Sequence, residues 1–89
     1  MQKHDTRIIN KLGLHARAAS KFANTAGRFS CGVEVHCRHK IINGKSIMAL
    51  MLLAASQGTE LTLVTNGGDE AEAMQALLAL IDDKFDEGE

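Results

Sequence analysis

The sequence lacks the features that mark several large classes of protein. Its 10 lysines and arginines do not outnumber its 11 aspartates and glutamates, and the formal net charge of -1 offers no basic excess for nucleic-acid binding. No stretch approaches the roughly 18 apolar residues of a membrane span, and the opening MQKHDTRIIN holds no apolar signal-peptide core. Proline, tryptophan and tyrosine are absent, which says little about function. We expect a cytoplasmic protein that neither binds nucleic acid nor inserts into a membrane.

Cysteine is scarce, and its placement argues against a disulfide. Cys31 and Cys37 fall in what the pattern predicts to be one strand, so their Cα atoms would lie roughly 20 Å apart, far beyond the ~7 Å limit for a disulfide. We expect core thiols in a reducing compartment. His36, Cys37 and His39 do not suggest a metal site, because His36 and Cys37 would point to opposite faces of the strand and a fourth ligand is not evident. We therefore expect no metal and no cofactor.

The hydrophobic pattern predicts a small α+β protein. With 89 residues, 45% of them hydrophobic and 24% charged, the chain fits a single domain over residues 1–89. Alternating apolar residues predict strands, and apolar residues three and four apart predict helices. Strands are predicted at about residues 6–10, 33–38, 40–42 and 60–66, and helices at about residues 16–27, 47–57 and 70–85. In this β-α-β-β-α-β-α order, helices covering one face of a four-stranded antiparallel sheet would bury the apolar stripes.

Residues typical of helix ends flank the predicted helices. Gly27 and Gly58 stand where C-terminal glycine caps belong. Ser46 stands at an N-cap position. Asp69 opens the last helix, with Glu72 three residues later in a variant of the capping-box spacing.

His15 differs from an ordinary surface histidine because of its position. It directly precedes the first predicted helix, and histidine is a poor capping residue, so the N–H groups of Ala16, Arg17 and Ala18 are free to bind an anion. The Arg17 guanidinium adds a planar cation suited to phosphate oxygens. The positive helix end and the guanidinium also disfavour protonation of the imidazole, and neutral imidazole is the nucleophilic form. These residues predict a histidine that accepts a phosphoryl group.

Two strings of the sequence resemble signatures of one family. GLHARAA, which contains His15, resembles the active-site signature of the HPr phosphocarrier family, and NGKSIMALMLLAASQGTELTL resembles the family's second signature. The resemblance implies an open-faced β-sandwich, with three helices over a four-stranded antiparallel sheet. It also implies that His15 accepts a phosphoryl group on Nδ1 from Enzyme I of the phosphoenolpyruvate-dependent phosphotransferase system. His15 would pass it to an Enzyme IIA-type acceptor, with Arg17 stabilising the phosphate.

Ala18 departs from the family pattern, because many members carry proline there. Proline would fix φ and remove an amide hydrogen at the helix start. With Ala18 we expect a less rigid helix start, one more donor and a small effect on the phosphorylated state.

Ser46 admits a structural and a regulatory interpretation. Serine is a favoured N-cap, worth about 1 kcal/mol over alanine, and this role alone explains it. The resemblance implies the second role, since some members are phosphorylated at the matching serine by a dedicated kinase, which inhibits transfer through His15. A serine kinase and its phosphatase are therefore possible partners.

The second predicted helix is too apolar to be buried on every side of so small a domain. Its run IMALMLLAA is apolar at every position, whereas a helix on a sheet needs one apolar stripe. Leu50 and Leu53 suit the core. Some of Ile47, Met48 and Met51 should face water near the end that holds His15, where exposed methionines would form a pliable partner surface. The residues that the resemblance adds to this docking surface are Arg17, Ser20, Lys21 and Asn24 on the first helix, and Lys45, which would steer acidic partners.

Two questions of function stay open at this point. The terminal FDEGE, the alanine at position 18 and the apolar second helix favour the nitrogen-related regulatory branch of the family over the sugar-uptake branch. A binding module that uses the same surface without carrying phosphate is the alternative, although retention of His15 with Arg17 argues against it. We expect a monomer that turns over no small molecule by itself, and an acidic end, DDKFDEGE, that frays.

Overall fold

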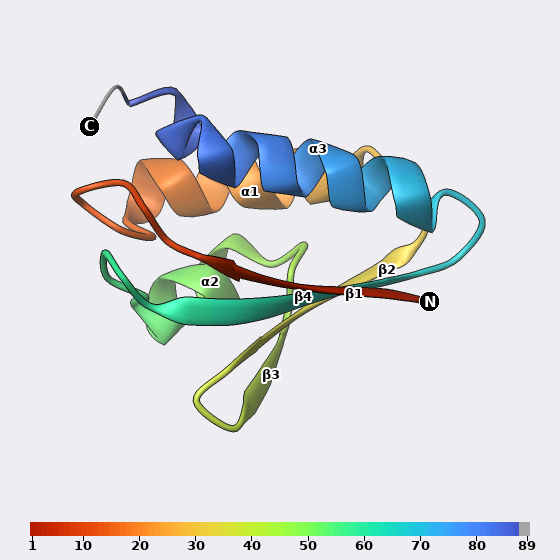
Figure 1. The fold of residues 1–89 in the computed structure, drawn as a ribbon, viewed down its shortest axis with the longest axis horizontal. Helices are drawn as coiled ribbons and strands as arrows, with labels where there is room; N and C mark the ends of the chain where they lie inside the picture. The colour runs from red at the N-terminus through yellow and green to blue at the C-terminus, as the bar shows by residue number, and fades with distance from the viewer. Residues whose placement is uncertain (88–89) are drawn as a thin grey trace.

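The computed structural model describes residues 1–87 and has the predicted order of elements. The elements are β1 (Gln2–Arg7), α1 (Ala16–Gly27), β2 (Gly32–Cys37), β3 (Lys40–Asn43), α2 (Ile47–Leu53), β4 (Glu60–Asn66), α3 (Glu70–Asp82) and a short 3-10 turn, η1 (Lys84–Asp86). The four strands lie in the order β1-β4-β2-β3, and every neighbouring pair is antiparallel. Figure 1 shows α1 and α3 side by side over one face of the sheet. This is the open-faced β-sandwich that the sequence predicts.

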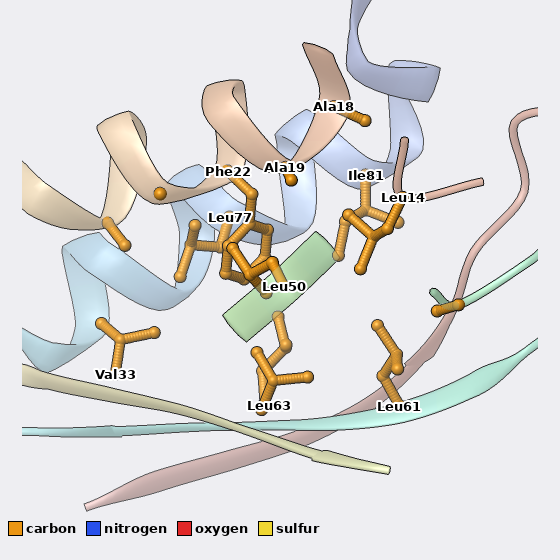
Figure 2. Packing of buried hydrophobic residues seen from close by; sticks show 14 of the residues in the cluster. Leu14, Ala18, Ala19, Phe22, Val33, Leu50, Leu61, Leu63, Leu77 and Ile81 are labelled. Carbon is orange, nitrogen blue, oxygen red and sulfur yellow. The ribbon is translucent and has the colours of Figure 1, made fainter. Parts of the chain in front are cut away.

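The core lies between the helices and the covered face of the sheet. In β2 the alternation is as predicted, with Val33, Val35 and Cys37 buried and Glu34 exposed. Both cysteines are buried free thiols, as expected. The labelled core residues in Figure 2 are Leu14, Ala18, Ala19, Phe22, Leu50, Leu77 and Ile81 from the helices and the loop before them, and Val33, Leu61 and Leu63 from the sheet. No helix within residues 1–87 is long and apolar enough to cross a bilayer.

The first strand lies earlier in the chain than the sequence predicts. It runs from Gln2 to Arg7, not from residue 6 to 10, and pairs with β4 from Gln2↔Thr65 to Arg7↔Glu60. Most of its residues are exposed, so it lacks the apolar signal that the prediction relied on. Of the predicted TRIIN strand only Thr6 and Arg7 belong to β1, and the apolar Ile8 and Ile9 lead out of the sheet toward the loop before α1.

Both predicted glycine caps are wrong. Gly27 is the last residue of α1, and the following Arg28 has ordinary right-handed angles (φ -73, ψ -15). The second helix ends at Leu53, well before Gly58, because Ala54 takes a left-handed conformation with φ 52. The apolar run therefore continues past the end of its helix.

Asp69 stands at the N-cap of α3 but bonds elsewhere. Its side chain makes no capping hydrogen bond to α3, and Glu72 forms no hydrogen bond within residues 1–87, so the predicted capping box is absent. The carboxylate accepts hydrogen bonds from the backbone N–H groups of Ser30 and Cys31, each at 2.9 Å. The bond from Ser30 is the chief reason that the pKa of Asp69 lies below its usual value. Asp69 thus fastens the start of α3 to the segment that leads into β2.

We expect Asp69→Asn to destabilise the protein at neutral pH and to matter less in acid. Because the folded-state pKa of Asp69 lies below the unfolded value of about 3.9, its stabilising effect is fully present above that value. The effect is lost as the pH falls through the folded pKa. Urea unfolding followed by circular dichroism between about pH 7 and pH 2.5 measures this. Asp82→Asn removes the same charge from an exposed position of α3 as a control. A stability difference that does not shrink in acid would contradict the assignment.

Candidate phosphoryl-acceptor site

His15 begins α1 without capping it. It stands at the N-cap with φ -74 and ψ 178, and its side chain makes no hydrogen bond to the first turn. The carbonyl of His15 accepts from the N–H of Ala19 at 2.8 Å. The preceding N–H groups of Ala16, Arg17 and Ala18 lie at the positively polarised helix end, where a helix offers no internal partner. Ala16 and Arg17 are exposed and Ala18 is fully buried, so the first two belong to residues that a phosphate can reach.

A tight contact fixes the loop that presents His15. Gly13 has φ +68, and a Cβ built on it would lie 2.4 Å from the carbonyl oxygen of Ala55. The next residue, Leu14, donates its N–H to the same oxygen at 2.8 Å. The glycine of GLHARAA therefore serves two needs, a left-handed backbone and close approach to the segment that follows α2.

We expect Gly13→Ala to destabilise the protein by about 2 kcal/mol or more, since it adds a backbone clash to an unfavourable φ. The same substitution should slow phosphorylation of His15. Gly27→Ala is the matched control, because its added Cβ would meet nothing within 4 Å, and in a helix alanine is favoured by roughly 0.5–1 kcal/mol. Thermal unfolding of both variants checks the prediction. Equal stability of the two variants would contradict it.

Arg17 is available to a ligand. It is exposed and makes no hydrogen bond or ion pair with any residue in the described part of the chain. Arg17 is the second residue of α1, in the first turn of the helix. Guanidinium and backbone N–H groups are the two kinds of donor that the sequence analysis assigns to an anion at this helix end, and that assignment stays a prediction.

The structure adds two residues that the sequence analysis missed. The carboxylate of Glu87, whose side chain is 9% exposed, bonds through Oε2 to Nε2 of His15. Its Oε1 accepts a hydrogen bond from Nδ2 of the buried Asn10 at 2.8 Å. Asn10 also donates to the carbonyl of Gly13 at 2.9 Å. Glu87 lies 72 positions from His15, so no local pattern connects the two.

The acidic end of the chain was expected to fray. Up to Glu87 it is instead folded against the rest of the protein. Phe85 is fully buried, and its carbonyl accepts from Nζ of Lys21 at 2.7 Å. In Figure 1 this end of the chain lies close to the loop between β1 and α1. Residues 88–89 of the same predicted segment lie outside the described residues.

Glu87 is ionised at neutral pH. Burial alone would raise the pKa of this carboxyl group. The hydrogen bonds that Glu87 makes with Asn10 and His15, together with electrostatic attraction to His15 and Arg17, outweigh that effect and lower the pKa below its usual value. His15 therefore lies between the Glu87 carboxylate and the positive end of α1. The sequence indicated only the helix end and Arg17 as charges that act on His15. The other ring nitrogen, Nδ1, makes no hydrogen bond within residues 1–87.

A shallow apolar hollow of about 260 Å³ borders His15. It is lined by Leu12, Leu14, His15, Ala16, Met51, Ala54, Ala55 and Ser56. Of the predicted docking residues on α2, Ile47, Met48 and Met51 are exposed as expected, by 40%, 72% and 45%. Leu52 is 77% exposed, which the sequence did not predict. In a run that is apolar at every position, the sequence does not show which side chains face the core. Leu50 and Leu53 are buried, as predicted.

The polar residues assigned to the docking surface are partly engaged within the protein. Ser20 and Asn24 approach each other at 3.5 Å on α1. Lys21 donates to the Phe85 carbonyl, and Lys45 donates through Nζ to the carbonyl of Phe29 at 2.7 Å. Both ammonium groups are thus tied to the backbone, which limits their reach toward a partner.

Ser46 performs its predicted structural role. Its Oγ accepts a hydrogen bond from the N–H of Ala49 at 3.2 Å, which caps α2.

His36, one of the residues considered as a metal ligand, instead bonds through Nε2 to Glu34 at 2.9 Å. Within residues 1–87, no group of three or more histidine, cysteine or acidic residues could hold a metal ion.

The fold and the site define a class of protein, a small phosphocarrier with a histidine at an open helix end. Residues 2–83 match the family described as "PTS HPr component phosphorylation site". The phosphocarrier protein HPr of Pseudomonas putida is 54% identical over 90 residues, and that of Neisseria meningitidis serogroup A is 56% identical over 89 residues, each match covering 100% of both chains. The crystal structure of HPr-C-His from Thermoanaerobacter tengcongensis superposes with a TM-score of 0.94 at 46% identity, over 98% of each chain. The chain belongs to the HPr family.

Family membership establishes the activity. The protein is a phosphocarrier of the phosphotransferase system that receives a phosphoryl group from Enzyme I and transfers it to an Enzyme IIA-type acceptor. It is a carrier and not an enzyme in its own right. The predicted relationship to the HPr family is thereby confirmed, and nothing in these matches favours the nitrogen-related branch.

Proposed function

We propose that His15 carries the phosphoryl group on its Nδ1 atom. Its place at the uncapped N-terminus of α1 is the observation that supports this most strongly. The Nδ1 lone pair attacks the phosphorus of a phosphohistidine on Enzyme I in line, and the donor P–N bond breaks with its electrons returning to the donor ring. A histidine of the acceptor later attacks in the same way. Because the chemistry needs little beyond positioning and charge stabilisation, a small domain suffices.

Arg17 and the first amides of α1 are the proposed phosphate ligands. The N–H groups of Ala16 and Arg17 belong to exposed residues, and that of Ala18 requires a small local opening of the helix start. Helix-end stabilisation of an anion is worth roughly 0.3–1 kcal/mol. Such a modest amount suits a carrier, because the group must also leave.

We expect the wild-type protein to acquire acid-labile phosphate when it is incubated with phosphoenolpyruvate and Enzyme I, and His15→Ala to acquire none. Removal of the nucleophile abolishes the transfer, whereas His4→Ala, at another exposed histidine, should leave it intact. Intact-mass spectrometry at neutral and acidic pH measures the phosphate and its lability. Phosphate that persists unchanged in His15→Ala would contradict the assignment. No phosphate on the wild type would instead favour the binding-module alternative.

The exposed face of α2 is the proposed docking surface for both Enzyme I and the acceptors. It consists of Ile47, Met48 and Met51, to which the exposure of Leu52 adds a fourth residue. Met51 also lines the hollow beside His15, which joins the docking surface to the reacting atom. Flexible methionines can repack against unrelated partners. The proposed polar margin of this surface consists of Ser20, Lys21, Asn24 and Lys45.

Ser46 is the proposed regulatory phosphorylation site, with a serine kinase and a phosphatase as further partners. The half-buried hydroxyl already lies at the start of α2, where phosphate oxygens could replace it as acceptors for the Ala49 N–H. The added charge would lie beside Ile47 and Met48, so it would disturb docking more than folding.

We expect acid-stable phosphate on Ser46 when the protein is isolated from its own cells, and none in Ser46→Ala. Ser46→Ala should also lower the free energy of unfolding by about 1 kcal/mol through loss of the cap. Peptide mass spectrometry and urea unfolding measure the two effects. Loss of stability without any acid-stable phosphate would leave only the capping role.

The cellular setting is proposed from the family and the sequence. We propose a monomer in the cytoplasm, where the buried thiols Cys31 and Cys37 would stay reduced. Sugar uptake and nitrogen-related regulation are both compatible with the site. The comparison that separates the two branches is whether a sugar-type or a nitrogen-type Enzyme I charges the protein faster.

A further inference from the structure

The end of the chain is folded back onto the site by an unusual turn. Lys84, Phe85 and Asp86 have φ values of 55, 54 and 63, so three successive non-glycine residues adopt the left-handed conformation. Such a turn is unfavourable by itself and persists only where other contacts fix it. The burial of Phe85 is one of those contacts. The hydrogen bond from Nζ of Lys21 to the Phe85 carbonyl is another, and the bonds of Glu87 are a third.

Glu87 is held from both sides. Nδ2 of Asn10 donates to its Oε1 at 2.8 Å, and Nε2 of His15 bonds to its Oε2. Asn10 is itself fixed to the carbonyl of Gly13, the residue that sets the loop before His15. The carboxylate therefore contacts both the imidazole and the loop that positions it.

The contact selects one form of the imidazole. An ionised carboxylate only accepts hydrogen bonds, so Nε2 must carry the proton that lies between the two groups. In a neutral ring the lone pair then resides on Nδ1, since the hydrogen bond at one nitrogen determines the state of the other. Nδ1 is the atom to which the proposed function assigns the phosphoryl group.

We propose that Glu87 is a positioning residue for phosphoryl transfer, holding His15 in the Nε2–H tautomer so that Nδ1 is free to attack. When Nδ1 forms its bond to phosphorus, the Nε2 proton stays in place and the ring gains a formal positive charge. The donor ring, which carries that positive charge while it is phosphorylated, loses it as the P–N bond breaks and leaves as a neutral imidazole. The Glu87 carboxylate faces the nitrogen that shares this charge. This inference rests on the proposed role of His15 and adds a residue from the opposite end of the chain.

The tautomer can be measured without any transfer reaction. Ring nitrogen chemical shifts of His15, recorded by NMR where the ring is neutral, should show a protonated Nε2 and an unprotonated Nδ1 in the wild type. Glu87→Ala should give a mixture of tautomers. Glu87→Gln keeps the shape and a carbonyl that can accept the bond, so it should retain more of the Nε2–H form than Glu87→Ala.

Phosphorylation by Enzyme I provides the second measurement. We expect the rate to fall roughly tenfold in Glu87→Ala, as for the loss of one charge-assisted hydrogen bond, and less in Glu87→Gln. Asp86→Asn is the charge-matched control, since the Asp86 side chain is 84% exposed and, among residues 1–87, forms an ion pair only with Lys21, at 3.9 Å. It should leave both the ring shifts and the rate unchanged. Thermal unfolding of each variant shows whether the chain end stays folded.

The outcomes distinguish a failure of the proposal for Glu87 from a failure of the proposed role of His15. If Glu87→Ala loses stability while its ring shifts and transfer rate stay at wild-type values, Glu87 only anchors the end of the chain and the proposal is wrong. If the wild type takes no phosphate from Enzyme I, the proposed role of His15 fails, and the ring shifts still report on the Glu87 contact by themselves.

Discussion

The contact on which the site depends is the hydrogen bond between the N–H of Leu14 and the carbonyl of Ala55, 2.8 Å long, with Gly13 packed against the same oxygen. It joins the loop that enters α1 to the segment that leaves α2. Leu14 belongs to the first signature, GLHARAA, and Ala55 belongs to the second. Neither signature by itself shows that the two residues meet. This hydrogen bond places His15 at the rim of the apolar hollow that Met51 lines. The backbone itself thereby brings His15 close to the surface that we propose for docking.

The same contact helps to explain why α2 is short. The run IMALMLLAA has the propensity to continue as a helix, yet the chain leaves the helix at Ala54 in a left-handed conformation. The carbonyl of Leu53 accepts from Nη2 of Arg38 at 3.3 Å, and that of Ala55 accepts from Leu14. Groups from two other segments thus replace the bonds that a longer helix would have made. Leu52, in the last turn of this short helix, is exposed and adds to the proposed docking surface.

Short stretches of the sequence sufficed to predict α1 and the start of α2. The spacing of Ala19, Phe22, Ala23 and Ala26 defined α1, and serine at position 46 marked the start of α2. His15 stood out because a poor capping residue occupied a capping position. The ends of β1 and α2 were missed, because backbone pairing and tertiary hydrogen bonds decide them.

Long-range contacts explain the other gaps. Asn10 and Glu87 could not be found from the sequence, because Asn10 resembles part of a strand and Glu87 resembles part of a solvated tail. They are joined to each other across 77 positions. Nothing in either segment reveals that contact. The left-handed turn that brings Glu87 back is also locally unfavourable, by roughly 1–2 kcal/mol per residue, so sequence propensity argues against it.

The charges around His15 follow from what a carrier must do. A site that bound phosphate very tightly would accept it readily and release it poorly, so each stabilising group has to be modest. In the proposed site the helix end and Arg17 would attract the phosphate oxygens, each by an amount that solvent reduces at an exposed position. In the arrangement that we propose, Glu87 acts on the opposite nitrogen of the ring and so favours the positive charge of the phosphorylated imidazole without contacting the phosphoryl group. Because the same carboxylate would also repel the phosphate oxygens at longer range, the two effects partly offset each other. The net stabilisation is then small enough for transfer to run in both directions.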